Sequence, residues 1–115
     1  MDIHVLKVKK ENGKEMVVMK VSENCDLASY IVFDSTYDDD EQSNLNRHSY
    51  MFPIQEVKAN DYVLLYTGNG ENNHYPNLGG STTWEFYWGL DINVWNKDGD
   101  EVVLIKVAEQ KRYLC

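Results

Sequence analysis

The strongest strand signal in the chain is Tyr62-Val63-Leu64-Leu65-Tyr66-Thr67. Its residues are β-branched, aromatic or apolar at every position, so both faces of a strand here would be apolar. That pattern is typical of a central strand that is covered on both sides. Lys58-Ala59-Asn60-Asp61 before it reads as a turn, and Gly68 follows it. We therefore expect an inner strand that is paired along both edges.

Upstream of this strand, alternating apolar and polar residues predict further short strands. The runs are Ile3–Lys9, Glu15–Val21, Leu27–Asp34 and His48–Phe52. Asn12-Gly13 between the first two predicts a two-residue type I′ hairpin turn, because this pair readily adopts positive φ angles. Pro53 ends the fourth run, since proline cannot donate a ladder hydrogen bond. The polar segment from Ser35 to Asn46 is expected to be a solvated loop.

Downstream, the pattern predicts more short strands and one long loop. Gly68–Thr83 is rich in Gly and Asn and is expected to be a loop, followed by short strands at Glu85–Trp88 and Asp91–Trp95. Asn96–Asp100 reads as a turn into a strand at Glu101–Val107, and residues 108–115 either extend that strand or form one more. No stretch of ten residues has a helical apolar stripe. The chain is therefore expected to be one all-β domain, residues 1–115, an antiparallel sandwich or barrel of seven to nine short strands.

Several stretches, in this order, resemble the lamin tail domain. They are Tyr50-Met51-Phe52-Pro53, Asn60–Gly68 and Trp95-Asn96-Lys97-Asp98-Gly99-Asp100-Glu101-Val102-Val103-Leu104. The chain departs from the family where Ala28-Ser29-Tyr30 follows Asp26-Leu27 in place of the family's Leu-x-Gly-Trp continuation. The resemblance, to a bacterial-type member, implies an antiparallel Ig-like β-sandwich. It also implies binding or scaffolding, with no catalytic residues to carry over.

The composition limits the partners that we expect. The 115 residues carry eleven Lys and Arg against nineteen Asp and Glu, a net charge of −8. Such a surface repels phosphate backbones, so we expect no nucleic-acid partner. No apolar run approaches the roughly 20 residues of a membrane helix, and no signal peptide is seen, so we expect no membrane contact and a cytoplasmic location. Cys25 and Cys115 are expected to be free thiols.

The candidate metal and phosphate motifs fail on spacing or geometry. Asn96–Asp100 resembles a calcium loop but lacks the glycine and glutamate that an EF-hand needs further on. Asp38-Asp39-Asp40-Glu41 offers adjacent carboxylates that diverge on an extended loop, and cation binding there is left open. Gly68-Asn69-Gly70 lacks the rest of a phosphate-binding fingerprint, and the three histidines are scattered. We expect no metal, no cofactor and no enzymatic activity.

The aromatic stretch from Tyr75 to Trp88 carries the binding hypothesis. Tyr75, Trp84 and Tyr87 are the candidate binding residues, because aromatic side chains beside polar loops dominate many interfaces. Phe86, Trp88 and Trp95 are expected to pack in the core, whereas Tyr75 and Trp84 fit core and surface equally well. The favoured function is a non-enzymatic binding or scaffolding module that meets a protein through loops or an exposed edge strand. The alternative is a carbohydrate-binding sandwich that uses the aromatic loop 68–88. The sequence leaves the oligomeric state and the partner open.

Overall fold

The computed structural model describes residues 1–38, 41–42, 48–95, 100–111 and 113–115. The described residues form eleven strands and one 3-10 turn. They are β1 (Ile3–Glu11), β2 (Lys14–Val21), β3 (Cys25–Asp26), η1 (Leu27–Ser29), β4 (Tyr30–Asp38), β5 (Glu41–Gln42), β6 (Ser49–Met51), β7 (Glu56–Val57), β8 (Tyr62–Tyr66), β9 (Asn73–Pro76), β10 (Thr82–Tyr87) and β11 (Asp100–Lys106).

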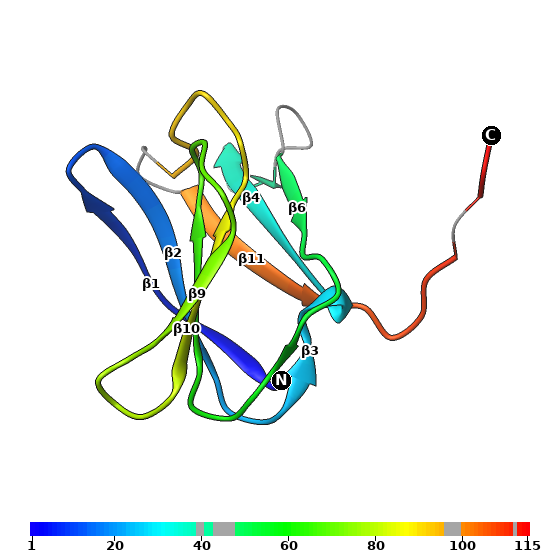
Figure 1. The fold of residues 1–115 in the computed structure, drawn as a ribbon. Coiled ribbons are helices and arrows are strands. Elements are labelled where there is room, and N and C mark those ends of the chain that lie inside the picture. Colours follow the sequence, from blue (N-terminus) through cyan, green and yellow to red (C-terminus); the bar gives the residue numbers. More distant parts are fainter. Residues whose placement is uncertain (39–40, 43–47, 96–99, 112) are drawn as a thin grey trace.

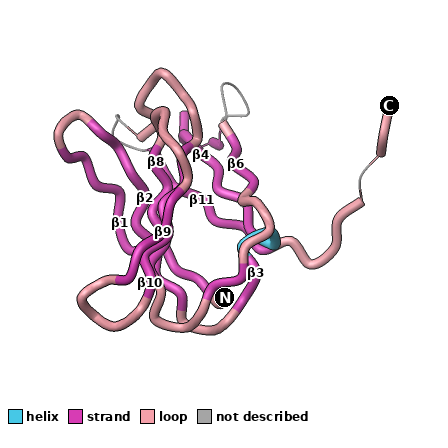
Figure 2. Tube along the Cα trace, viewed as in Figure 1, coloured by secondary structure: helices cyan, strands magenta, loops and turns pink. Residues whose placement is uncertain are grey.

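Most of the strands form two packed layers, and β3 pairs with β7 in a separate two-stranded sheet. The first layer is a five-stranded sheet in the order β1-β2-β8-β10-β9, and the second is built on β4, which pairs with β11, β5 and β6. Figure 1 shows the two layers facing each other and the C-terminal segment projecting from the body, and Figure 2 shows how little of the chain is helical. None of the described residues belongs to a helix that could span a membrane. The prediction of an all-β, Ig-like sandwich is confirmed, and the eight strands longer than two residues match the expected number.

Strand β8 lies in the middle of the five-stranded sheet, as predicted, and is paired on both edges. It runs antiparallel to β2 and parallel to β10, so the sheet is mixed rather than wholly antiparallel. Val63 and Leu65 are fully buried between the layers. Tyr62, Leu64 and Tyr66 on the opposite face are only half-buried. The expectation of cover on both faces of β8 was therefore wrong.

The parallel pairing explains the long segment between β8 and β10. Two parallel neighbours need a crossover connection, because a tight hairpin can join only antiparallel strands. Here the connection contains β9, which pairs antiparallel with β10 on its outer edge. The prediction of a loop over Gly68–Thr83 was therefore wrong at Asn73–Pro76, which form β9. The sequence does not predict β9, because Asn73 and Pro76 are poor strand formers.

Three other local expectations change. Leu27–Ser29 is a 3-10 turn capped by Asp26, whose side chain accepts a hydrogen bond from the Ala28 N–H, so the third strand begins at Tyr30. Strand β4 continues to Asp38 and pairs with β5, where the sequence predicted a loop. Asp91–Trp95 is not a strand. The turn and calcium-like motif at Asn96–Gly99, and Asp39 and Asp40 of the acidic run, lie outside the described residues.

The first hairpin matches the sequence prediction. Asn12 and Gly13 have φ angles of 52° and 76°, and Glu11 pairs with Lys14 across them. These are the positive values that a type I′ turn requires. The pairing of β1 with β2 shifts register between Val5 and Lys7, which is a β-bulge on an edge strand. Bulges and lysines on an edge strand oppose pairing with other chains.

A buried carboxylate fixes the segment after β10. Glu15 is 2% exposed, and its two oxygens accept hydrogen bonds from the Val94 N–H at 2.6 Å and the Trp95 N–H at 3.1 Å. Both donors are satisfied by charge-assisted bonds, which are stronger than neutral ones. Trp95 is thereby held in the core against Trp88, as predicted, although Trp88 itself is only half-buried.

A second charged cluster closes one edge of the sandwich. The Tyr30 hydroxyl donates to Asp2 Oδ2 at 2.7 Å, and Lys106 Nζ lies 2.9 Å from the same oxygen. Asp2 directly precedes β1, Tyr30 begins β4 and Lys106 ends β11, so the cluster joins the two layers. The hydrogen bond from Tyr30, followed by that from Lys106, lowers the pKa of Asp2 to about 2.

We predict that Trp95→Ala lowers the free energy of unfolding by about 3–5 kcal/mol, as for other large aromatic truncations in packed cores. Urea denaturation measures the change. Ile92→Ala is the control, because Ile92 is exposed and should change stability by less than about 0.5 kcal/mol. A loss below about 1 kcal/mol for Trp95→Ala would contradict its place in the core.

The Asp2 cluster predicts an acid-dependent loss of stability. Asp2 binds protons more weakly in the folded state than in the unfolded state. Its contribution to the free energy of unfolding is therefore complete above its unfolded pKa of about 3.9. The contribution is lost as the pH falls through the folded value of about 2. Asp2→Asn should therefore be less stable than wild type at neutral pH, and the difference should shrink as the pH falls through this interval. Glu109→Gln, in the exposed tail, is the control. The free energy of unfolding is measured as a function of pH. A difference between wild type and Asp2→Asn that stays constant from neutral to acid pH would contradict the prediction.

Candidate functional site

Strand β10 divides the predicted binding residues between the two faces of its sheet. Phe86 is buried and Trp84 packs against the core, so these two point inward. Glu85 and Tyr87 alternate with them and point outward. Tyr75 of β9 pairs with Thr83, which belongs to the same outward set. The structure therefore brings Tyr75 and Tyr87 onto one face and places Trp84 on the other.

The outer side chains of β8, β9 and β10 form a surface that we call the tyrosine face. It comprises Tyr62, Leu64, Tyr66, Asn73, Tyr75, Thr83, Glu85 and Tyr87. Four of the eight tyrosines of the chain lie there. Sequence reasoning missed Tyr62 and Tyr66, because it assigned both faces of β8 to the interior. Because both faces of β8 are apolar, the residue types do not show which face of the sheet is exposed to solvent.

Glu85 lies among these tyrosines. The Tyr66 hydroxyl donates a hydrogen bond to Glu85 Oε2 at 3.2 Å. Burial, followed by the negative charge of Glu85, raises the pKa of Tyr66, Tyr75 and Tyr87. The three hydroxyls therefore remain protonated at neutral pH and can donate hydrogen bonds. The arrangement offers a carboxylate acceptor surrounded by phenol donors.

The rings of Tyr66 and Tyr87 cover each other. Their centroids are 4.8 Å apart and their planes differ by 10°, because the two residues are in register on parallel strands. The backbone of Gly70 lies against Tyr87, where an added Cβ would come within 2.4 Å of the ring. The Lys20 ammonium lies 5.1 Å from the ring centroid of Tyr62. The tyrosine face thus presents ring edges and hydroxyls, and Tyr75, at 40% exposure, is its most open aromatic residue.

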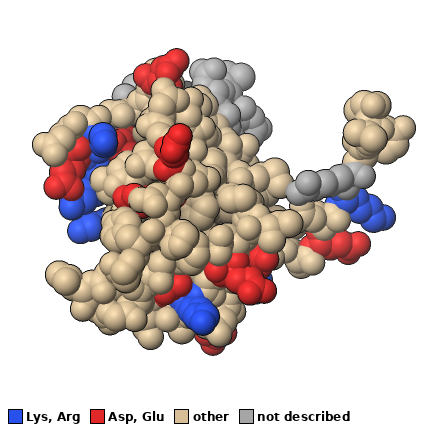
Figure 3. Space-filling view, in the orientation of Figure 1, with Lys and Arg blue, Asp and Glu red and all other residues tan. Residues whose placement is uncertain are grey.

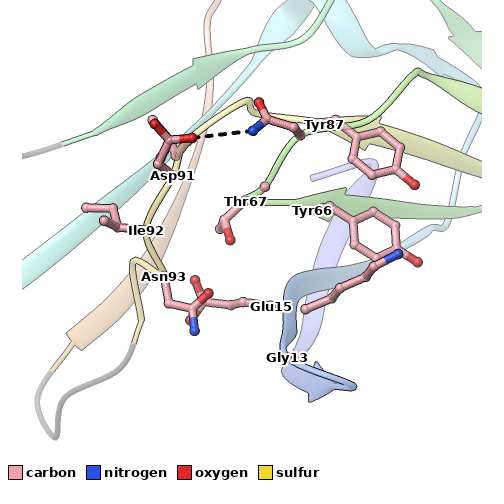
Figure 4. Close-up of a pocket in the computed structure, with 12 residues that line it drawn as sticks. Gly13, Glu15, Tyr66, Thr67, Tyr87, Asp91, Ile92 and Asn93 are labelled. Atoms are coloured by element: carbon pink, nitrogen blue, oxygen red, sulfur yellow. Dashed lines mark hydrogen bonds between the residues drawn. The ribbon is translucent and has the colours of Figure 1, made fainter.

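A pocket of about 290 Å³ lies at the end of the tyrosine face, beyond the last residues of β8 and β10. Thr67, Asp91 and Asn93 line it together with the stacked tyrosines. Figure 4 shows the rings of Tyr66 and Tyr87 side by side at one end of the pocket, on the side away from Asp91. Asn69 Nδ2 donates to Asp91 Oδ1 at 3.4 Å. Polar side chains and apolar ones such as Leu90 and Ile92 line the pocket together, and the Glu15 carboxylate in its wall is already bonded to the backbone.

The charges are unevenly distributed around this face. The β1–β2 hairpin, residues 3–21, has five lysines and two glutamates, a net charge of +3 in a chain of −8. Lys20 of β2 pairs with Tyr62 and borders the tyrosine face directly. Lys7 and Lys9 of β1 lie on the same side of the sheet, one strand further out, and Lys9 is ion-paired with Glu11. In Figure 3 the surface over β9 and β10 carries few charges, whereas basic and acidic side chains lie together over the hairpin at the left. The tyrosine face therefore has a basic margin.

Trp84 has structural contacts on the inner side. Its indole Nε1 donates to Asp61 Oδ2 at 3.0 Å, and its ring stacks on His74 at 4.7 Å. Asp61 also accepts hydrogen bonds from the Lys58 and Thr82 N–H groups, both at 3.0 Å. Burial raises the pKa of Asp61, but these three hydrogen bonds outweigh it and leave the pKa below its usual value. The carboxylate is therefore ionised and ties the start of β8 to the start of β10.

The described part of the chain holds histidines, carboxylates and two cysteines outside the tyrosine face. Within that part, no three His, Cys, Asp or Glu side chains lie close enough to hold a metal ion. Cys25 is half-buried and Cys115 is exposed, and both are free thiols. Burial raises the pKa of the Cys25 thiol, which disfavours the reactive thiolate.

Comparisons of the chain with known protein families, with curated proteins and with solved structures found no match.

We predict that Trp84→Phe lowers the free energy of unfolding by about 1–3 kcal/mol, because it leaves one bond of the buried Asp61 carboxylate unmade. Urea denaturation measures the loss. Tyr75→Ser, on the neighbouring strand, is the control and should change stability far less, since Tyr75 is exposed. Equal stability of wild type and Trp84→Phe would show that the indole bond does not contribute.

Proposed function

We propose that the protein is a non-enzymatic binding module that takes up a protein partner on the tyrosine face. The observation that carries the proposal is the gathering of Tyr62, Tyr66, Tyr75 and Tyr87 on the outer side of three adjacent strands. Tyrosine is enriched at the centres of protein interfaces, because it combines a large apolar ring with a polar tip and loses little conformational entropy. The site lies on a sheet face, a place that the sequence analysis did not consider.

The ring geometry favours a protein over a carbohydrate. Sugars bind to aromatic residues by stacking on an open ring face. The faces of Tyr66 and Tyr87 lie against each other, and the backbone of Gly70 packs closely against the Tyr87 ring. Trp84, another aromatic residue of the carbohydrate hypothesis, stacks on His74 and points inward, which leaves Tyr75 as the one candidate with an exposed ring. Ring edges and hydroxyls suit the mixed apolar and hydrogen-bonding contacts of a protein surface.

The charges around the face specify the chemistry of the partner. Glu85 lies among the tyrosines as an acceptor, so the partner should place an Arg, a Lys or a backbone N–H over it. Lys20 borders the face beside Tyr62, with Lys7 one strand further out, so the partner should carry acidic side chains along that margin. Complementary charges of this kind speed association and align the partners. A partner with a basic centre and an acidic rim on one side fits both conditions.

The resemblance to the lamin tail domain supports the same class of function. Membership of that family is part of the proposal, and it rests on Tyr50–Pro53, Asn60–Gly68 and Trp95–Leu104. In that family the domain binds or scaffolds, without catalysis.

The test uses wild type, Tyr75→Ser and Ile54→Ser as baits in a cell extract. Ile54 is the matched control, because it is a large apolar residue, 82% exposed, in the loop between β6 and β7. A protein retained by wild type and Ile54→Ser but not by Tyr75→Ser is then purified, and its affinity is measured by calorimetry. We expect Tyr75→Ser to weaken binding by more than about 1 kcal/mol, the usual threshold of an interface hot spot. Glu85→Gln should weaken it too.

Two results would contradict the proposal. One is that no protein distinguishes wild type from Tyr75→Ser while all three variants remain folded by circular dichroism. The other is glycan-array binding by wild type that Tyr75→Ser abolishes, which would favour the carbohydrate alternative.

A further inference from the structure

The pocket at the end of the tyrosine face has walls that the backbone holds in place. Beyond the ends of β8 and β10 the two segments stay side by side, because the Trp88 and Leu90 N–H groups donate to the carbonyl oxygens of Tyr66 and Thr67, both at 2.8 Å. Further along, two more N–H groups bind the buried Glu15 carboxylate. The segment after β10 is therefore fixed on both sides of the pocket, and the pocket is preformed. A preformed site loses little conformational entropy on binding.

Thr67 brings a hydroxyl into this pocket. The residue is 1% exposed, and its N–H donates to the Glu15 carbonyl oxygen at 3.1 Å. Its hydroxyl makes no hydrogen bond to any other described residue. It is open to the pocket, since the described chain holds no enclosed polar side-chain atom without a partner. Figure 4 shows the hydroxyl pointing into the pocket, on the side of Asn93. It is therefore available to a ligand.

Asp91 brings a carboxylate to the same pocket. Its Oδ1 accepts a hydrogen bond from Asn69 Nδ2 at 3.4 Å, and its Oδ2 has no partner in the part of the chain that the structure describes. Asn69 follows β8, so this bond joins the two walls. Asn93 adds an exposed amide. The pocket thus offers oxygen acceptors from both segments that form it.

Carboxylates outnumber ammonium groups around the pocket. Glu15 and Asp91 line it together with Lys14, and Glu85 is bonded to one of the stacked tyrosines. Lys10 Nζ lies 3.9 Å from Glu15 Oε2. These three carboxylates and two ammonium groups belong to a chain of net charge −8. The local and the overall charge therefore both favour a cation over an anion.

The size and the apolar residues of the pocket suit one long side chain. Its volume of about 290 Å³ is at the small end of ligand sites, which span roughly 300–1,000 Å³. Leu90 and Ile92 line it beside the polar groups, so it can hold a methylene stem as well as a charged end. Arginine combines such a stem with a planar guanidinium whose N–H groups can meet several oxygen acceptors at once. The ammonium of lysine is a point charge and matches this set less well.

We propose that this pocket receives the guanidinium of an arginine side chain from the protein partner that docks on the tyrosine face. The inference rests on the proposed function, because the arginine belongs to that partner. The guanidinium donates hydrogen bonds to the Asp91 carboxylate and the Thr67 hydroxyl, while its stem packs on Leu90 and Ile92. Asp91 and Thr67 thus determine specificity for the partner, and neither was among the binding residues predicted from the sequence.

An NMR titration of the full chain with acetyl-arginine-N-methylamide tests the pocket without the partner. We expect saturable shifts at the amides of Thr67, Leu90 and Asp91. Acetyl-citrulline-N-methylamide has the same shape without the charge, so it should bind at least about tenfold more weakly. Acetyl-lysine-N-methylamide should also bind more weakly than the arginine probe, because it lacks the planar set of donors.

Substitutions that keep the side-chain shape test the two assigned residues. Asp91→Asn and Thr67→Val should weaken binding of the arginine probe about tenfold and about threefold, because each removes one acceptor. Lys14→Ala should strengthen binding, since it removes an opposing charge. Glu56→Gln, which changes an exposed carboxylate on β7, is the matched control and should leave the affinity unchanged. The amide spectrum of each variant shows whether it is folded, and Asp91→Asn decides the test if Thr67→Val does not fold.

Three results would overturn the inference. They are the absence of saturable shifts, equal affinity for the arginine and citrulline probes, and probe binding that Asp91→Asn leaves unchanged.

The inference and the proposed function fail separately. Tyr75→Ser should abolish capture of the partner and leave probe binding unchanged, whereas Asp91→Asn should weaken both. A partner that wild type and Asp91→Asn bind equally would overturn the inference and leave the proposed function intact. Probe binding without any partner that distinguishes wild type from Tyr75→Ser would contradict the proposed function, while the preference of the pocket for a guanidinium would stand.

Discussion

The hydrogen bonds of the Asp61 carboxylate fix the parallel pairing on which the rest of the structure depends. One oxygen accepts the Thr82 N–H, and the other accepts the Trp84 indole and the Lys58 N–H. The carboxylate therefore joins the turn before β8 to the first residues of β10. It aligns the two strands at the point where their register begins, with Thr83 beside Tyr62. A parallel pair has no tight turn to set its register, so a side-chain contact of this kind takes that role.

The tyrosine face follows from that register. Because β8 and β10 run parallel, Tyr66 meets Tyr87 directly and Glu85 lies beside Leu64, within hydrogen-bond distance of the Tyr66 hydroxyl. The crossover that the parallel pair requires carries β9 to the outer edge and adds Tyr75. Trp84 binds Asp61 on the inner side and so stabilises the register rather than the surface.

The sandwich has two open faces of different character. The tyrosine face combines rings, hydroxyls and one carboxylate beside a basic margin, which suits a partner of defined charge. The outer face of the second sheet carries apolar side chains of β4, β6 and β11, with Ser49 and Glu101 on the same side. Glu15 anchors the segment after β10, and the Asp2 carboxylate joins the two layers through Tyr30 and Lys106.

The sequence by itself determined the elements that depend on local chemistry. Asn12-Gly13 specified a type I′ hairpin, Tyr62–Tyr66 a central strand and Trp95 a core position, since turn preference, strand propensity and apolar size act locally. The tertiary structure alone decided the direction of β10 against β8, the existence of β9 and the face that each aromatic residue occupies. Tyr75, Trp84 and Tyr87 have the same chemistry in the sequence. Alternation along β10 puts Trp84 and Tyr87 on opposite faces, but which face stays open, and that Tyr75 shares it with Tyr87, depends on the pairing and register of distant strands.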